Sequence, residues 1–250
     1  MLSPCPASPQ WHTAMPDIPE FSSLDAVFAI PGNSISSSYF TEVLRIEIGG
    51  TVYFVKRHHE GGKGLRKWLG MPRIVSEYLN LQRFSEWDIP VPRMVAWGYE
   101  RKWGIFKRGA LITAEIRNSQ DLAEMARNKD GRFQDANWVH AISKNLSTYT
   151  RTMHAHKFGH NDLQWRNLIV DDAGVLYFID CPCGRFWEFP FLQYRIVKDL
   201  AGLDKIAKKT VSKTQRLRFY LDYRGIKKLA KSDKARIARI LKFYRGRGSN

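Results

Sequence analysis

This chain of 250 residues has little cysteine and no long run of apolar residues. Its three cysteines, Cys5, Cys181 and Cys183, are too few for a disulfide framework, and Cys181-x-Cys183 lacks the second ligand pair of a zinc site. No segment approaches the roughly 18 apolar residues of a membrane span, and the first residues lack the basic and apolar regions of a secretory signal. We therefore expect reduced thiols and a protein that stays in the cytoplasm.

Acidic residues are also scarce, because 24 Asp and Glu stand against 40 Lys and Arg and leave a formal net charge of +16. Residues 195–250 hold 18 Lys or Arg against 4 Asp, a surplus of 14. A surface of this kind favours nucleotide phosphates, nucleic acid or an anionic membrane surface as partners. The chain contains no RNA- or DNA-binding motif, so no specific nucleic acid is expected.

One stretch of this basic region, residues 232–247, predicts an amphipathic helix. Ile237, Ile240, Leu241 and Tyr244 recur at helical spacing, and lysines and arginines lie off that face. The basic face is either simply solvated or attracted to anionic lipid, since Lys and Arg bind near a negative leaflet.

The apolar pattern predicts an α+β protein with a small strand-rich half and a larger helical half. Residues 1–25 indicate a loosely ordered leader, residues 26–116 an N-terminal lobe and residues 117–250 a C-terminal lobe. The polar stretch 32–38 predicts a loop, and Gly49-Gly50 predicts a hairpin turn. The predicted strands are residues 27–30, 43–48, 52–56, 94–99 and 110–113, and the predicted helices include residues 72–84 and 138–156.

The most informative motif is His160-Asn161-Asp162-Leu163-Gln164-Trp165-Arg166-Asn167, followed by Ile179-Asp180. Phosphoryl transfer from a nucleotide needs a carboxylate that orients the acceptor hydroxyl and oxygen ligands that hold Mg²⁺ against the phosphates. The spacing supplies these groups in the order that protein kinases use. We expect Asp162 to face the acceptor, and Asn167 and Asp180 to bind the metal. His160 is expected to brace the loop rather than to act as a base.

Upstream residues supply candidates for nucleotide binding. Lys56 ends a predicted strand 21 residues before Glu77, which lies in the first long helix; in kinases a strand lysine grips the phosphates and a helix carboxylate holds it. Backbone N–H groups of the loop around Ser34 and Ser36 can meet phosphate oxygens. The segment 114–117 looks like a hinge between the lobes, and Glu115 and Ile116 in it are expected to contact the nucleotide.

These residues resemble the lipopolysaccharide kinases of the Kdo/WaaP family, within the protein-kinase-like superfamily. The resemblance covers residues 39–247 and is strongest over residues 160–170 and 178–180; it includes Lys56, Glu77 and the basic stretch with Lys198-Asp199-Leu200-Ala201. It implies a two-lobed kinase-like fold and ATP- and Mg²⁺-dependent phosphorylation of a sugar hydroxyl, on a heptose or Kdo of the lipopolysaccharide inner core. It also implies a lipopolysaccharide core glycolipid as partner and a peripheral location at the cytoplasmic face of the inner membrane.

Two segments depart from the family pattern. Asp180-Cys181-Pro182-Cys183-Gly184-Arg185 stands where this family more often has Asp-Phe-Asp followed by a basic residue and Gly. The predicted nucleotide loop has Gly32 and several serines in place of repeated glycines. The segment after Asp180 has no Ala-Pro-Glu end, which argues against an ordinary regulated protein kinase.

Alternatives to this interpretation remain open. A RIO-like protein kinase or a small-molecule phosphotransferase would share the spacing from Asp162 to Asn167. A catalytically dead kinase-like module that binds membrane or RNA is a different class of protein, and turnover of ATP with Mg²⁺ would separate it from the enzymes.

Overall fold

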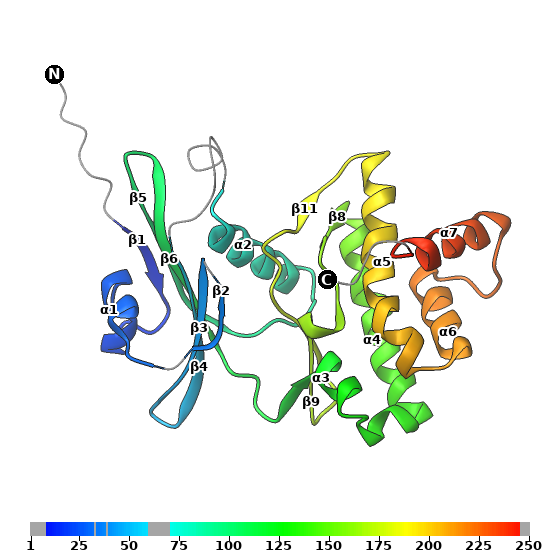
Figure 1. Cartoon of the computed structure of the whole chain (residues 1–250), viewed down its shortest axis with the longest axis horizontal. Helices are drawn as coiled ribbons and strands as arrows, with labels where there is room; N and C mark the ends of the chain where they lie inside the picture. Colours follow the sequence, from blue (N-terminus) through cyan, green and yellow to red (C-terminus); the bar gives the residue numbers. More distant parts are fainter. Residues whose placement is uncertain (1–8, 33, 39, 60–70, 246–250) are drawn as a thin grey trace. The chain divides into compact units, whose positions relative to one another are not determined.

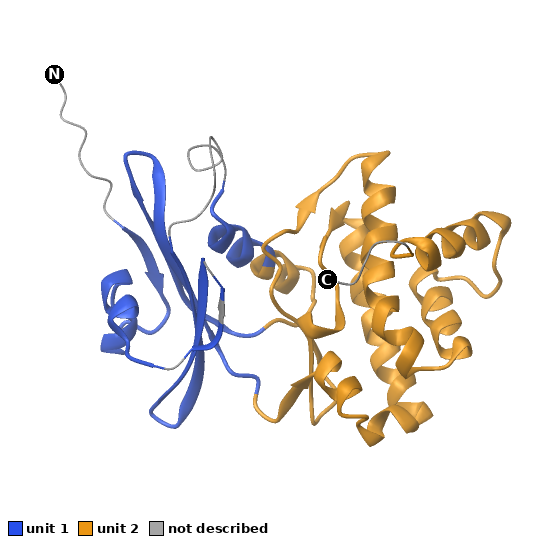
Figure 2. Ribbon diagram, in the orientation of Figure 1, with its two compact units in different colours: residues 1–80, 92–116 blue, residues 81–91, 117–250 orange. Residues whose placement is uncertain are grey.

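The computed structural model describes residues 9–32, 34–38, 40–59 and 71–245. The chain forms two compact units, unit 1 with residues 1–80 and 92–116, and unit 2 with residues 81–91 and 117–250 (Figure 2). Residues 81–91, which were predicted to belong to the N-terminal lobe, group instead with unit 2. The last residues of the helix that begins after Pro72 therefore belong to unit 2.

Unit 1 is built on an antiparallel sheet with the strand order β1-β5-β6-β4-β3-β2 (Figure 1). The hairpin predicted at Gly49-Gly50 joins β3 to β4, with Ile48 opposite Thr51. Both glycines have positive φ, 58° and 71°, which a two-residue turn matching the twist of the strands requires. The strands are β1 (Gln10–Thr13), β2 (Ser34–Ser38), β3 (Thr41–Ile48), β4 (Thr51–His58), β5 (Met94–Lys102) and β6 (Ile105–Ala114).

The prediction of a loosely ordered leader is wrong for residues 9–25, whereas residues 1–8 lie outside the described part of the chain. Strand β1 pairs with β5, and η1 (Pro19–Phe21) follows it. Phe21 and Leu24 are buried in the core of unit 1 together with Tyr53 of β4. The apolar residues of this segment are widely spaced and have no local period, so the local pattern does not reveal its strand.

The strand predicted at residues 27–30 is also wrong, because helix α1 (Leu24–Ala29) occupies this segment. Ser23 caps the helix by accepting a hydrogen bond from the backbone N–H of Ala26 at 3.1 Å. A side-chain cap satisfies one of the free N–H groups of the first turn, which favours a helix over the β propensity of the sequence. The polar stretch 32–38 differs from the prediction as well, since residues 34–38 form β2 and pair with β3.

Helix α2 (Arg73–Glu86) begins directly after Pro72, as predicted, and continues two residues beyond Phe84. In unit 2 the helix predicted at residues 138–156 is α4 (Ala136–Ala155). The helix predicted at residues 232–247 is α7 (Lys231–Lys242), which begins one residue earlier and ends five residues earlier than predicted. Residues 246–247 of that prediction lie outside the described residues. Among the helices that the structure describes, none has both the length and the apolar character needed to cross a membrane.

Unit 2 is mainly helical, with helices α5, α6 and α7 sharing one apolar core around Leu200 and Tyr223 (Figure 1). Two small antiparallel sheets, β10-β9-β7 and β11-β8, carry the loops that hold the candidate site. The remaining elements are β7 (Ser119–Asp121), α3 (Leu122–Arg127), η3 (Gly131–Gln134), β8 (Phe158–Gly159), η4 (Trp165–Asn167), β9 (Leu168–Asp171), β10 (Leu176–Phe178), β11 (Arg185–Phe186), α5 (Phe191–Thr210) and α6 (Lys213–Arg224).

Candidate active site

In unit 1 the structure brings Lys56 and Glu77 together. Strand β4 holds Lys56 between Val43 of β3 and Leu111 of β6, so its backbone is fixed on both sides. The Lys56 ammonium lies 2.9 Å and 2.8 Å from the two carboxylate oxygens of Glu77. The Glu77 side chain is only 5% exposed and that of Lys56 20%, so the pair is largely removed from water. A lysine held in this way presents a fixed positive charge at the surface of the unit.

The other candidates of unit 1 are engaged within the sheet. The Ser34 hydroxyl donates to the backbone oxygen of Ser36 at 2.7 Å, inside strand β2 rather than in a loop. The Glu115 carboxylate accepts from the Arg45 guanidinium at 3.1 Å. The backbone N–H of Glu115 donates to Val52 at 2.9 Å, which ties this segment to β4. Nucleotide contacts of Ser34, Ser36, Glu115 and Ile116 remain predictions.

In unit 2 the loop of residues 160–167, called the catalytic loop after the role predicted for Asp162, is closed on itself. The Asn167 side-chain amide donates to the backbone oxygen of Asp162 at 2.8 Å and reaches its carboxylate at 3.4 Å. The turn η4 brings Asn167 back, with its backbone N–H donating to Gln164 at 2.9 Å. Since the amide nitrogen is used in these bonds, the amide oxygen is the atom that can serve as a metal ligand.

Asp180 is placed beside this loop by the hairpin of β9 and β10. Leu168 and Phe178 face each other in the register, and the backbone N–H of Ile179 donates to the backbone oxygen of Asn167 at 3.0 Å. Asn167 and Asp180 therefore lie at the same end of the hairpin. Asp180 has a φ of 55°, a left-handed conformation that is uncommon for a residue other than glycine and that is often found at functional sites.

Two neighbours orient the Asp162 carboxylate. Arg166 pairs with one oxygen at 2.8 Å, and the side-chain amide of Gln164 donates to the other. The Arg166 side chain is 58% exposed, and an exposed ion pair of this kind contributes little to stability. Turning Arg166 toward an anionic ligand would therefore cost little stability.

A buried aspartate that the sequence prediction missed anchors the loop. Asp199 of α5 is 1% exposed, and its two carboxylate oxygens accept from the backbone N–H groups of Asn161 at 2.9 Å and His160 at 2.8 Å. In the sequence Asp199 is a single carboxylate between the apolar residues Val197 and Leu200, and the family resemblance included it without giving it a role. Gly202, one turn further, lets α5 approach the loop, because a Cβ there would meet the Leu163 backbone oxygen at 2.3 Å.

The anchor extends to helices α4 and α6 through two more buried side chains. His154 Nε2 donates to Asp199 at 3.3 Å, which leaves Nδ1 to accept from the Tyr223 hydroxyl at 2.9 Å. Burial raises the pKa of Tyr223, so this hydroxyl keeps its proton. Three helices therefore fix the start of the catalytic loop through a single carboxylate.

Asp199→Asn is expected to loosen the start of the loop, because the Asp199 carboxylate fixes the backbone N–H groups of His160 and Asn161. The free energy of unfolding should fall by about 1–3 kcal/mol, since the amide group of Asn turns a donor toward a backbone N–H. Amide hydrogen exchange at His160 and Asn161 should be faster in this variant than in the wild type. Asp204→Asn, on the same helix, is the matched control and should leave exchange at these two positions unchanged.

His160 lies in the apolar interior of unit 2. It is fully buried, stacks on Phe84 with a centroid distance of 5.9 Å, and neither ring nitrogen has a hydrogen-bond partner among the described residues. Burial lowers the pKa of His160, although the carboxylates of Asp199, Asp162 and Asp180 oppose this effect. A neutral ring without polar contacts packs the loop and is poorly placed to act as a base.

The lowered pKa of His160 predicts a pH-dependent stability. Below about pH 6.5 the unfolded chain binds a proton at this residue that the folded chain does not bind. The free energy of unfolding therefore decreases as the pH is lowered, by up to about 1.4 kcal/mol per pH unit. His160→Leu removes this contribution. Lowering the pH from about 7 to 5 should therefore destabilise the wild type more than the variant, as measured by thermal unfolding. Parallel curves for the two proteins would contradict the assignment.

The unusual segment after Asp180 is tightly packed. A Cβ at Gly184 would lie 2.5 Å from the Cys181 sulfur and 2.4 Å from the Phe158 ring, so only glycine fits. Neither Cys181 nor Cys183 forms a disulfide, and Cys181 is buried. The Asn161 side chain donates to the backbone oxygen of Cys183 at 2.8 Å, which joins this segment to the catalytic loop.

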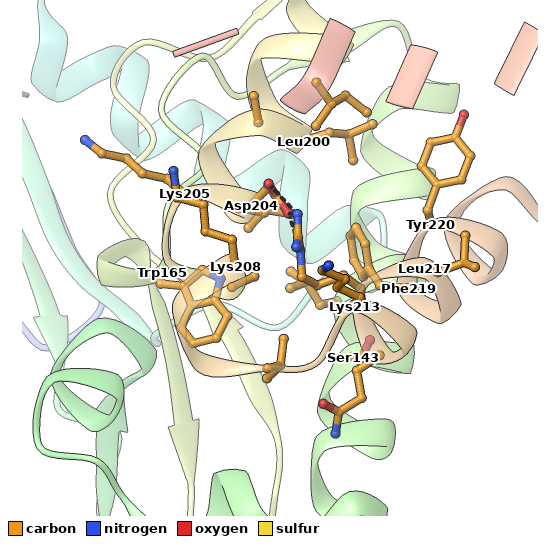
Figure 3. A pocket seen from close by; sticks show the side chains of 18 of the residues that line it. Ser143, Trp165, Leu200, Asp204, Lys205, Lys208, Lys213, Leu217, Phe219 and Tyr220 are labelled. Carbon is orange, nitrogen blue, oxygen red and sulfur yellow. Dashed lines mark hydrogen bonds and ion pairs between the residues drawn. The ribbon is translucent and has the colours of Figure 1, made fainter. Parts of the chain in front are cut away.

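Unit 2 also contains a cavity of about 740 Å³ among helices α4 to α7 (Figure 3). Its lining is mostly apolar and includes Trp165 of the catalytic loop, while Lys205, Lys208 and Lys213 add positive charge. The volume lies within the range of small-molecule sites. An occupant of the cavity would touch the catalytic loop through Trp165.

Comparison with known proteins supports a family assignment and a fold. The sequence profile of the lipopolysaccharide kinase (Kdo/WaaP) family matches residues 38–223. A solved structure of WaaP in complex with acyl carrier protein is similar, with a TM-score of 0.73 and 18% sequence identity over 94% of this chain and 97% of that chain. This likeness confirms the predicted α+β protein-kinase-like fold, an N-terminal antiparallel sheet followed by a mainly helical region. No curated protein matches this chain.

Proposed function

We propose that this chain, which belongs to the lipopolysaccharide kinase (Kdo/WaaP) family, transfers the terminal phosphate of ATP to a sugar hydroxyl of the lipopolysaccharide inner core, on a heptose or Kdo. Membership of the family implies a phosphotransferase that uses ATP. The observation that carries the proposal is the closed loop of unit 2, in which Asn167 holds the backbone of Asp162 at 2.8 Å beside the Asp180 hairpin.

Asp162 is proposed to act on the acceptor. Its carboxylate accepts a hydrogen bond from the sugar hydroxyl and takes the proton as the oxygen bonds to phosphorus, while the bond to the departing diphosphate breaks. Arg166 and Gln164 orient this carboxylate in the structure. When the phosphate arrives, the exposed Arg166 can exchange its partner for a phosphate oxygen.

In unit 1, Lys56 is proposed to bind the phosphates of ATP, with Glu77 holding its ammonium in place. Neutralising phosphate charge with a positioned lysine lowers the barrier without any covalent chemistry by the protein. The largely buried carboxylate of Glu77 keeps the ammonium in one orientation, at 2.8 Å.

The chemistry of the residues fits a magnesium ion. Mg²⁺ is usually bound by one or two carboxylates together with substrate phosphates and water. Asp180 offers a carboxylate and Asn167 an amide oxygen at the same end of the β9–β10 hairpin. When bound, the ion would neutralise charge on the phosphates, and Asn167 and Asp180 are the residues proposed to hold it.

The acceptor can be tested with purified protein, ATP, Mg²⁺ and lipopolysaccharide from cells that lack this protein. We expect phosphate to enter the core, and mass spectrometry of the deletion strain to show the loss of one phosphate group from the inner core. Phosphorylation of a protein or of a small metabolite, with an unchanged core, would favour a RIO-like kinase or a small-molecule phosphotransferase. ATP binding without transfer to any acceptor would favour the binding module.

A carrier protein is proposed as a further partner, because the similar WaaP structure contains acyl carrier protein. The apolar cavity with Lys205, Lys208 and Lys213 suits an acyl chain delivered by an anionic carrier. An acyl chain in contact with Trp165 would rigidify the catalytic loop.

The carrier is tested by thermal unfolding. Carrier protein loaded with a long acyl chain should raise Tm, and the same carrier without the chain should have little effect, since burial of the chain supplies the stabilisation. Leu217→Glu, which puts a carboxylate into the cavity lining at an exposed position, should remove the difference. Equal shifts with both carriers would contradict acyl binding.

A further inference from the structure

Exposed aromatic residues concentrate in one short segment of unit 2. Of the ten large hydrophobic side chains that are exposed among the described residues, four lie within nine positions, from Phe186 to Tyr194. Phe189 is 79% exposed, Phe191 64% and Tyr194 48%. Apolar side chains that gather in this way on a surface usually mark an interaction site.

Basic residues of the last helix share the surface with these rings. Phe189 and Tyr194 line a hollow together with Arg239, Lys242 and Arg245, and none of the described residues that line it is acidic. Tyr194 contacts Phe243 with a ring distance of 5.5 Å, which fixes the end of α7 against the start of α5. The aromatic and cationic groups therefore lie on one surface of one unit.

The only acidic side chain of the aromatic segment is compensated. Glu188 forms an ion pair with Lys157 at 3.0 Å. Arg195 lies over the Trp187 ring at 3.9 Å and so stays close to the aromatic residues. The segment and the end of α7 together present positive charge around apolar rings.

We propose that this surface docks the protein on an anionic phospholipid bilayer. It consists of the hollow lined by Phe189, Tyr194, Arg239, Lys242 and Arg245, together with the exposed Phe191, two positions after Phe189 in the chain. The phenylalanine rings enter the boundary between head groups and acyl chains, while the cations contact lipid phosphates. The positive charge of Arg239, Lys242 and Arg245 complements a negative leaflet, and no acidic residue among the described lining opposes it. The inference rests on the proposed function, because a lipid-anchored acceptor is found only at a membrane.

Binding to vesicles without lipopolysaccharide or ATP tests the surface separately from the reaction. Wild-type protein should co-sediment with vesicles of phosphatidylethanolamine and phosphatidylglycerol, and hardly with phosphatidylcholine alone. Phe189→Ala/Phe191→Ala should weaken binding at least about tenfold, since each ring loses its apolar burial. The control Trp103→Ala removes an aromatic side chain of unit 1 that is 67% exposed and should bind as the wild type does.

The charge contribution has its own matched pair of variants. Arg239→Gln/Lys242→Gln should weaken binding by roughly twentyfold at low salt and less at high salt, because each cation near an anionic surface contributes about a fivefold gain. Lys227→Gln/Lys228→Gln removes the same charge from an exposed stretch between α6 and α7 and should have a clearly smaller effect.

The outcomes separate this inference from the proposed function. Transfer to water-soluble core oligosaccharide should be unchanged in Phe189→Ala/Phe191→Ala, so the inference can fail while the kinase activity stands. The inference would be overturned if the wild-type protein did not bind anionic vesicles. It would also be overturned if the aromatic variant kept vesicle binding and lost acyl carrier protein binding, or raised the KM for the oligosaccharide, because the surface would then bind protein or sugar.

Discussion

Asp162→Asn is expected to lower the rate of phosphate transfer by about 10²–10⁴-fold, because the amide cannot take the proton of the acceptor hydroxyl. The Asn side chain has the same size as Asp, and its amide oxygen can still accept a hydrogen bond from Asn167. Its pairing with the exposed Arg166 is lost, but a surface pair contributes at most about 1 kcal/mol to stability. Initial rates of phosphate incorporation and thermal unfolding of the same preparation measure both effects.

Asp172→Asn is the matched control for this experiment. The Asp172 side chain is 73% exposed in the turn between β9 and β10, a few residues from the same loop. The same chemical change there should leave both the rate and Tm near the wild-type values. A wild-type rate in Asp162→Asn would contradict the proposal that Asp162 takes the proton of the acceptor hydroxyl.

Lys56→Met is expected to remove most of the activity and to destabilise the protein. The variant loses the charge proposed to hold the phosphates of ATP, and it removes the Lys56 ammonium from the Glu77 carboxylate, which is 5% exposed. Removing one member of a buried pair costs about 3–5 kcal/mol, because the other charge remains desolvated. Denaturant unfolding and the KM for ATP should both change.

A double variant separates the two effects. In Lys56→Met/Glu77→Met no buried charge is left, so much of the free energy of unfolding should return, whereas activity should not. The loss of activity would then come from the missing ammonium rather than from a damaged fold. Recovery of activity in the double variant would mean that Lys56 has no part in binding ATP.

Local pattern was enough to predict several elements of the fold. Gly49-Gly50 specified the hairpin, and Pro72 marked the start of α2, because turn residues act within a few positions. The loop from Asp162 to Asn167 was equally accessible, since its hydrogen bonds join residues five positions apart.

Long-range packing accounts for the failures. The leader joins the sheet through β1 and β5, which are more than 80 positions apart, and its few apolar residues gave no period to detect. Asp199 meets the backbone of His160 across 39 positions. Burial of both partners explains why a charged residue stands in an apolar helix, and burial cannot be read from the residue type alone.

The sequence by itself determined the type of chemistry and the family, because the spacing of Asp162, Asn167 and Asp180 is a property of the chain. It also determined where the positive charge is concentrated. Only the tertiary structure decided which helix fixes the catalytic loop. It also decided that His160 packs in the interior as a neutral ring, and that Phe189 shares a surface with Arg239. These features depend on burial and on contacts between distant segments, and such contacts exist only when the chain is folded.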